Sequence, residues 1–191
     1  GLHSYQIEEA NNTSLCLFEY VYIARPDSVL DCGSVHAIRK EFGKQLARDY
    51  PVDADIVCGV PDSGNDAAQG YAEQSGIPYS AAFIKNKYIG RGLSNVKNTK
   101  KERLLKMRLN VLKSQVKGKR IVIIDDSLIH GNTASHIVKL LREAGASEVH
   151  MRISSPPLKY TCHYGSDFDF EKDMVANIMT EDEIKNFIGA D

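Results

Sequence analysis

The hydrophobic and polar positions of this chain follow a pattern in which strands and helices alternate. Short runs rich in apolar and β-branched residues predict strands at residues 18–24, 56–60, 79–84, 121–124 and 149–153. Apolar residues at helical spacing predict helices at residues 35–47, 65–75, 105–116 and 136–144, and a short helix after Thr180. This alternation predicts an α/β domain with a mostly parallel sheet and helices on both faces.

Several of these elements carry residues that favour their ends. Ser34 is a suitable N-cap, Gly76 is suitable just after a helix, and Thr180 with Glu183 matches a capping box. The run at residues 121–124 has no polar position, which is typical of a parallel strand buried on both faces. We therefore expect this strand to lie in the middle of the sheet.

The chain has 191 residues, which suffices for one well-buried domain. Residues 1–15 are polar at most positions and are expected to lead into a single domain at residues 16–191. Residues 85–101 are polar, basic and contain glycine. A long loop inside a compact domain usually serves as a lid or binding loop.

The charge balance and hydropathy exclude several function classes. Lys and Arg number 24 against 25 Asp and Glu, for a net charge of -1, so no overall positive field attracts nucleic acid. No apolar run is long enough to span a membrane, and no signal-peptide pattern opens the chain. We therefore expect a cytoplasmic protein with no membrane partner and no specific nucleic-acid partner.

The four cysteines form no Cys-x-x-Cys pair, which excludes a zinc ribbon and a thioredoxin motif. They are Cys16, Cys32, Cys58 and Cys162. Their spacing does not resemble a secreted disulfide framework. We expect reduced and mostly buried thiols.

The strongest candidate site follows the strand at residues 121–124. Asp125 and Asp126 come directly after the apolar run, and Gly131-Asn132-Thr133 precedes the next helix. Carboxylates at the end of a buried strand need a partner or a ligand, and N–H groups at a helix N-terminus bind phosphate. Hydroxyls bound at one end and phosphate at the other fit a sugar phosphate. The alternative is an acidic turn in which Asn132 or Thr133 only caps the helix.

A second candidate loop is Pro61-Asp62-Ser63-Gly64. It follows a buried strand and precedes a helix, so its amides can face an anion. Ligands in such folds bind beyond the carboxyl ends of the strands. The alternative for Ser63 alone is an ordinary turn residue.

The first of these loops resembles a known signature. Strand-Asp-Asp-Ser-x-x-x-Gly-x-Thr is similar to the site for phosphoribosyl pyrophosphate (PRPP) in type I phosphoribosyltransferases. Further motifs from residue 16 to the C-terminus resemble the glutamine PRPP amidotransferases, which open purine biosynthesis. These motifs are Phe18-Glu19-Tyr20, Ala24-Arg25-Pro26-Asp27-Ser28, Gly59-Val60-Pro61-Asp62-Ser63-Gly64, Gly70-Tyr71-Ala72, Lys85-Asn86-Lys87-Tyr88-Ile89-Gly90-Arg91, Arg142-Glu143-Ala144-Gly145-Ala146 and Arg152-Ile153-Ser154-Ser155-Pro156-Pro157.

The resemblance implies a type I phosphoribosyltransferase fold and a site for Mg²⁺ and PRPP. Ser63, Asp125 and Asp126 would line the Mg²⁺, and Lys87 would act with the two acids in catalysis by neutralising the leaving pyrophosphate. The PRPP-binding residues would be Asp62, Ser63, Gly64, Ser127, Ile129, His130, Gly131, Asn132 and Thr133. The resemblance also implies binding of purine nucleotides and assembly as a homo-oligomer.

Three features depart from that family. Residues 1–15 leave no room for its glutaminase domain, so we expect ammonia to come from solution or from a separate glutaminase subunit. Gly92-Leu93-Ser94 stands where the family has Thr-Phe-Ile, and His130 stands where it has Arg. Changes at residues 91–99 affect loop closure, and they endanger catalysis more than binding.

Some members of that family hold a structural iron–sulfur cluster. Cys16 and Cys162 match two of its four ligand positions, whereas Cys32 and Cys58 match none. Four thiolates are the usual requirement, so we do not expect a cluster in this chain. A cluster would use Cys16 and Cys162 and take its other ligands from elsewhere.

The sequence is compatible with two main functions. The first is an enzyme that forms 5-phosphoribosylamine from PRPP and ammonia. The second is a catalytically weakened PRPP or nucleotide sensor, or an accessory subunit that uses the basic stretch at residues 97–106 as a contact surface. The alternative for that stretch is a solvated helix face. A third hypothesis is that the protein is a phosphoribosyltransferase that acts on a different nucleophile.

Overall fold

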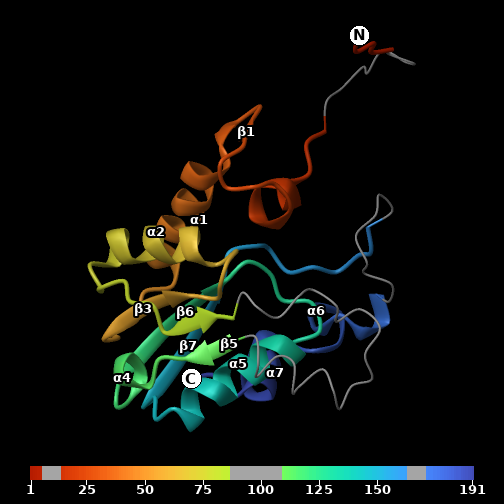
Figure 1. Cartoon of the computed structure of the whole chain (residues 1–191). Coiled ribbons are helices and arrows are strands. Elements are labelled where there is room, and N and C mark those ends of the chain that lie inside the picture. The colour runs from red at the N-terminus through yellow and green to blue at the C-terminus, as the bar shows by residue number, and fades with distance from the viewer. Residues whose placement is uncertain (6–13, 87–108, 163–170) are drawn as a thin grey trace.

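The computed structural model describes residues 1–5, 14–86, 109–162 and 171–191, and its strands and helices form an α/β structure, as the sequence predicts (Figure 1). In chain order they are η1 (Glu19–Ile23, a π-helix), β1 (Val29–Leu30), β2 (Gly33–Ser34), α1 (Val35–Asp49), β3 (Ile56–Gly59), α2 (Asn65–Ser75), β4 (Phe83–Lys85), β5 (Leu109–Val111), α4 (Lys113–Val116), β6 (Arg120–Asp125), α5 (Asn132–Glu143), β7 (Glu148–Ile153), η2 (Glu171–Asp173, a 3₁₀-helix), α6 (Val175–Ile178) and α7 (Glu181–Ile188). Within these ranges no helix has the length and apolarity needed to cross a membrane.

Three parallel strands form the central sheet in the order β3-β6-β7. Gly59 of β3 lies opposite Ile124 of β6, and Asp125 of β6 lies opposite Ile153 of β7. A parallel bridge from Tyr79 extends the sheet on the other side of β3. β6 is therefore the middle strand, as its apolar run predicted.

Successive side chains of β6 point into two separate cores. Ile121 and Ile123 pack on the side of α5, whereas Val122 and Ile124 pack on the side of α1 and α2. Figure 1 shows α1 and α2 on one side of the sheet and α5 and α7 on the other. A strand covered on both faces needs an apolar side chain at every position, which accounts for this run of four. The prediction of helices on both faces is confirmed.

Helices α1 and α2 pack through two glycines. A Cβ on Gly43 would lie 1.8 Å from the carbonyl oxygen of Ala67, and a Cβ on Gly70 would lie 1.9 Å from that of Lys40. The missing side chains let the two helix backbones touch. This contact determines where α2, and the loop at residues 61–64 before it, lies relative to α1.

The predicted strand at residues 18–24 is wrong, because this segment forms the helical turn η1. Phe18 and Tyr22, four residues apart, pack their rings with centroids 5.6 Å apart, which is a helical spacing. Tyr20 and Val21 turn inward and are buried. Strand propensity of aromatic and β-branched residues depends on a neighbouring strand, and packing against α1 outweighs it at this segment.

The predicted helix at residues 105–116 is wrong over residues 109–111. These residues form β5, which pairs antiparallel with β4 so that Val111 lies opposite Phe83. Leu109 and Val111 are half-buried and Asn110 is exposed, which is the two-residue period of a strand. Among the described residues 109–116, Lys113–Val116 is helical, as α4, and residues 105–108 lie outside the described residues.

Cysteine burial also differs from the prediction. Cys58 on β3 is fully buried, and burial raises the pKa of its thiol to about 12. Cys16, Cys32 and Cys162 are exposed. The prediction of mostly buried thiols is therefore wrong for three of the four positions.

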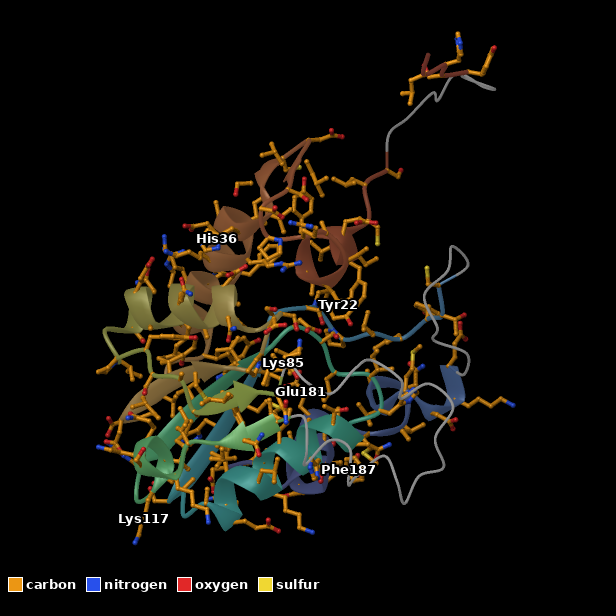
Figure 2. All side chains as sticks on the ribbon, in the orientation of Figure 1. Tyr22, His36, Lys85, Lys117, Glu181 and Phe187 are labelled. Carbon is orange, nitrogen blue, oxygen red and sulfur yellow. The ribbon has the colours of Figure 1, made fainter. Side chains whose placement is uncertain are left out.

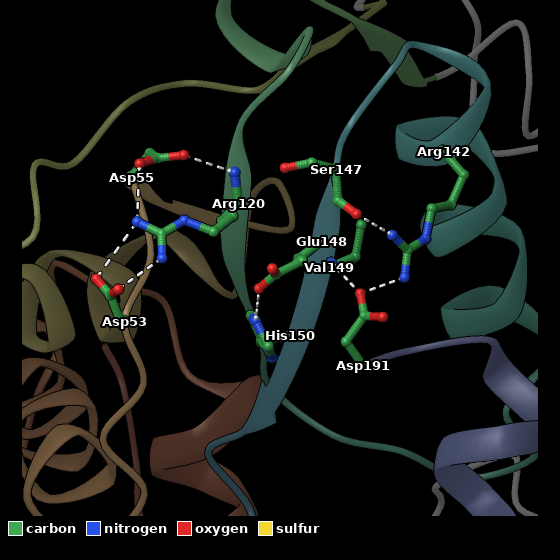
Figure 3. Close-up of polar contacts among 9 residues, drawn as sticks. All are labelled: Asp53, Asp55, Arg120, Arg142, Ser147, Glu148, Val149, His150 and Asp191. Atoms are coloured by element: carbon green, nitrogen blue, oxygen red, sulfur yellow. Dashed lines mark hydrogen bonds and ion pairs between the residues drawn. The ribbon is translucent and has the colours of Figure 1, made fainter.

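Figure 3 shows polar contacts at the first residues of β6 and β7. The two candidate loops follow the last residues of β3 and β6, so these contacts lie at the opposite end of the sheet. Arg120 Nη1 lies 2.6 Å from Asp53 Oδ2, and Arg120 Nη2 lies 3.2 Å from Asp55 Oδ1. The second oxygen of Asp55 accepts the Arg120 amide at 2.8 Å. Near β7, the Asp191 carboxylate accepts from Arg142 and from the Val149 amide.

The Asp55→Asn variant is expected to lose stability at neutral pH and little at acidic pH. The backbone amide of Arg120 and then its guanidinium hold the pKa of Asp55 below its ordinary value. A lowered folded pKa contributes stability above the unfolded pKa of about 3.9, and that stability is lost as the pH falls through the folded pKa. Thermal unfolding of both proteins at pH 7 and pH 3 should show midpoints that lie closer together at pH 3 than at pH 7.

Asp53→Asn is the matched control, because the Asp53 side chain is 87% exposed against 32% for Asp55. It should change the midpoint at pH 7 less than Asp55→Asn does. Equal effects of the two variants would contradict the special role given to Asp55.

Candidate functional site

Three loops meet at the carboxyl ends of the central strands. Asp125 ends β6, residues 61–64 follow β3, and Ser154 with Ser155 follows β7. The carbonyl oxygens of Asp125 and Asp126 accept the amides of Ser154 at 3.0 Å and Ser155 at 2.9 Å. On the other side, the Ile124 carbonyl accepts the Val60 amide at 2.8 Å. The backbone of the acid pair is therefore held from both neighbouring strands.

The side chains of the acid pair are buried next to each other. Asp125 is 9% exposed and Asp126 is 6% exposed. An Asp125 carboxylate oxygen accepts the Asp126 amide at 2.9 Å, and the Ser127 hydroxyl donates to Asp126. Burial, and secondarily the charge of Asp126, raises the pKa of Asp125 to about 8. Two neighbouring buried carboxyl groups, one with a strongly perturbed pKa, are typical of a functional site, and a bound cation would favour the charged form of both.

This pair fits Mg²⁺. The ion usually takes one or two protein carboxylates and completes its shell with water and substrate phosphate oxygens. Asp125 and Asp126 are sufficient by that standard, although the described ranges contain no cluster of three or more His, Cys, Asp or Glu. Ser63 is half-buried on the neighbouring loop, whose Gly64 packs against the end of β6.

The turn after the acid pair begins α5 at a glycine. Gly131 is the N-cap residue, with a φ of 72°, and it has no side chain to cap the helix. The alternative in which Asn132 or Thr133 caps α5 is therefore wrong; both are exposed in its first turn. First-turn amides have no acceptor within a helix, so this end of α5 is suited to an anion.

The loop at residues 61–64 leads into α2, and this helix, like α5, has a glycine as its N-cap residue. Gly64 is the N-cap residue, and a Cβ on it would lie 2.3 Å from the carbonyl oxygen of Ile124. Its amide donates to the Val60 carbonyl at 2.9 Å, and the peptide bond between Pro61 and Asp62 is cis. Two glycine-capped helix N-termini thus flank the acid pair.

Lys85 is a cation at this loop that the sequence analysis missed. Its ammonium group pairs with the carboxylate of Asp62, and the two side chains are 45% and 74% exposed. Figure 2 shows Lys85 near the middle of the molecule, at the end of β4. The predicted catalytic Lys87 lies outside the described residues. The signal in the sequence was the pair Lys85 and Lys87 on either side of Asn86. The sequence alone does not show which of these two lysines lies at the loop.

Arg39 is a second missed cation, and it is 4% exposed on α1. Its Nε donates to the carbonyl of Tyr20 at 2.6 Å and its Nη2 to that of Ala24 at 2.8 Å, which ties η1 to α1. Burial lowers the pKa of Arg39, and the charges of Asp66 and Asp126 oppose that shift. The buried guanidinium of Arg39 therefore lies close enough to the acid pair to interact with the charge of Asp126. The stripe that α1 buries consists of Val35, Arg39, Gly43 and Ala47.

Two further predicted site residues, Ile129 and His130, contact the C-terminal part of the chain. The carbonyl of Ile129 accepts the Val175 amide at 2.9 Å. The Nδ1 atom of His130, which is exposed, lies 2.9 Å from the carbonyl oxygen of Asp173. Neither contact was visible in the sequence, because more than 40 residues separate the partners. Cys16 and Cys162, the two positions that match cluster ligands, are both exposed.

Comparison with known proteins agrees with this architecture. Residues 27–155 match the family model of the phosphoribosyl transferase domain. The amidophosphoribosyltransferase of Mycobacterium tuberculosis (strain ATCC 25618 / H37Rv) is 49% identical over 181 residues, which are 92% of this chain and 34% of that protein. That of Bacillus subtilis (strain 168) is 45% identical over 191 residues, which are 100% of this chain and 40% of that protein.

A solved structure of glutamine phosphoribosylpyrophosphate amidotransferase from B. subtilis, complexed with ADP and GMP, has a TM-score of 0.87 to this chain at 45% identity. The match covers 100% of this chain and 42% of that one. The chain thus spans well under half the length of these relatives. Since the family model matches more than half of the residues and the fold agrees throughout, the chain belongs to the phosphoribosyl transferase domain family and has the type I phosphoribosyltransferase fold.

Proposed function

We propose that this chain binds PRPP with Mg²⁺ and transfers its phosphoribosyl group to ammonia, which forms 5-phosphoribosylamine for purine biosynthesis. One observation carries the proposal: a buried pair of carboxylates, Asp125 and Asp126, lies between two glycine-capped helix N-termini. PRPP has the complementary layout, with ribose hydroxyls between a 5-phosphate and a pyrophosphate. The amidophosphoribosyltransferase relatives support ammonia as the acceptor.

In this reaction the bond between ribose C1 and the pyrophosphate oxygen breaks, and its electron pair leaves with the pyrophosphate. The lone pair of ammonia forms the new C1–N bond, and the nitrogen then loses one proton to water. Positive charge develops on the ribose ring and negative charge on the leaving group. Positioning and fixed charges can therefore provide most of the rate enhancement.

Each part of the site has a role in this proposal. Asp125 and Asp126 hold the ribose hydroxyls and, with Ser63, the Mg²⁺ that would neutralise pyrophosphate charge when bound. The amides of Asp62 and Ser63 face the pyrophosphate, and the Lys85 ammonium group leaves the Asp62 carboxylate to pair with the same pyrophosphate. Lys87 would also act there, as predicted. Ser127 and the turn at residues 129–133 bind the 5-phosphate through backbone amides and hydroxyls.

Pyrophosphate release from PRPP tests this function. With Mg²⁺ and excess ammonium chloride at alkaline pH, we expect release whose rate rises with the concentration of ammonium. The alkaline pH supplies free ammonia, so glutamine is not needed. PRPP binding without release would favour the sensor below, and neither binding nor release would overturn the proposal.

The second candidate function is a PRPP or nucleotide sensor, or an accessory subunit. His130 stands where the resembling family has arginine, whose guanidinium carries a permanent charge and five donors. The substitution weakens the charge available at the phosphate turn without removing its amides. Together with the altered sequence at residues 91–99, it favours binding over turnover.

The cellular setting is part of the same proposal. We place the domain at residues 16–191 of a cytoplasmic protein that assembles as a homo-oligomer, and we expect ammonia from solution or from a separate glutaminase subunit. Adding a purified glutaminase and glutamine to the pyrophosphate assay would test the last point.

A further inference from the structure

The C-terminal segment from Asp173 to Phe187 contacts three consecutive residues of the turn before α5. Val175 donates its amide to the Ile129 carbonyl at 2.9 Å. The Asp173 carbonyl lies 2.9 Å from His130 Nδ1, and because a carbonyl only accepts, Nδ1 carries the proton. Phe187 packs on the next residue, Gly131. The turn is thus held from outside by a part of the chain that the resemblance assigned no role.

The contact between Phe187 and Gly131 is the closest of the three to the helix N-terminus. A Cβ on Gly131 would lie 2.8 Å from Phe187 Cε1, 3.1 Å from Cδ1 and 3.5 Å from Val175 Cγ1. The ring therefore fills the space where a side chain would stand. Phe187, labelled in Figure 2, lies where α7 packs against α5.

This turn needs such support because its own residues restrain it weakly. Gly131 has a φ of 72° and, without a Cβ, could adopt many other conformations at little cost. It offers no side chain to cap α5. A phosphate bound by backbone amides requires those amides to point at one place, and a displacement of about 1 Å can cost orders of magnitude in rate or affinity.

We propose that Phe187 is a positioning residue, whose ring holds Gly131 in the left-handed conformation so that the amides of residues 131–133 converge on one phosphate. The phosphate itself rests on the proposed function, whereas the restraint on the turn does not. Phe187 never touches the ligand. It acts through Gly131, and it is 43% exposed, so its loss should leave the rest of the core intact.

Phe187→Ala tests the proposal with two measurements on the whole chain. Without ligand, hydrogen exchange at the amides of Ser135 and Val175, which donate to the carbonyls of Gly131 and Ile129, should become roughly tenfold faster, while the amides of β6 keep their rates. PRPP affinity should fall roughly tenfold, while affinity for pyrophosphate with Mg²⁺, which binds at residues 61–64, should not change. Phe187→Leu, which refills most of the space, should restore both values toward those of the unmodified chain.

Ile178→Ala is the matched control, because it removes an apolar side chain from α6 that is 58% exposed. It should change neither measurement. Unchanged exchange at the amides of Ser135 and Val175 in Phe187→Ala would overturn the proposal, and so would an equal loss of affinity for PRPP and pyrophosphate. If the unmodified chain bound no PRPP, the proposed function would fall, and the exchange rates alone would decide the role of Phe187.

Discussion

Asp126→Asn is expected to reduce PRPP affinity and ammonia-dependent pyrophosphate release by about 10²–10³-fold. The exchange keeps the size of the side chain and one oxygen that can accept from Ser127. It removes one of two buried charges that would hold Mg²⁺ and the ribose hydroxyls. Titration calorimetry with PRPP and the pyrophosphate assay measure the two losses.

The fold should tolerate this change. Asp125 and Asp126 are neighbouring buried carboxyl groups, and after burial the charge of Asp126 is the second reason why the pKa of Asp125 is raised to about 8. Removing it relieves repulsion in the folded state. Asp49→Asn, which removes an exposed carboxylate at the end of α1, is the control and should leave binding unchanged. Normal PRPP binding by a folded Asp126→Asn protein would contradict the assignment of the acid pair.

Gly70→Ala is expected to lower the free energy of unfolding by about 3 kcal/mol or more, at the upper end of the range for overpacking. The new Cβ would lie 1.9 Å from the carbonyl oxygen of Lys40, a backbone atom that cannot rotate away. Helices α1 and α2 would have to separate, which also displaces the loop before α2. Denaturant unfolding measures the loss, and Gly43→Ala should behave alike for the same reason.

Gly118→Ala separates this effect from the general cost of replacing glycine. Gly118 has a φ of 73° but no atom within 4 Å of an added Cβ, so only backbone strain of about 1–2 kcal/mol is expected. If Gly70→Ala cost no more than Gly118→Ala, the close packing of α1 on α2 would be wrong.

Where local pattern and tertiary structure agree, the predictions hold. The run at residues 121–124 forms the middle of β6, helix α2 ends at Gly76 with a φ of 76°, and Thr180 with Glu183 forms the capping box of α7. Each signal depends on residues within one turn or one strand. Such signals need no knowledge of what the element packs against.

The failures share one cause, which is dependence on a distant partner. Residues 18–24 have strand propensity but form η1 because this segment packs against α1, whose Arg39 donates to the carbonyls of Tyr20 and Ala24. Residues 109–111 follow a helical spacing but become β5 because β4 lies beside them. Burial was misjudged for three cysteines for a similar reason, since exposure is a property of the whole fold.

The sequence by itself determined the α/β class, the central strand and the acid pair with its two loops, because each is encoded in a continuous run of residues. Only the tertiary structure decided which side chains support that site. Lys85 reaches Asp62 across 23 residues, and Phe187 reaches Gly131 from the far end of the chain. Neither contact produces a recognisable pattern in the sequence. Its two residues are far apart along the chain, and they need only fit together in the folded structure.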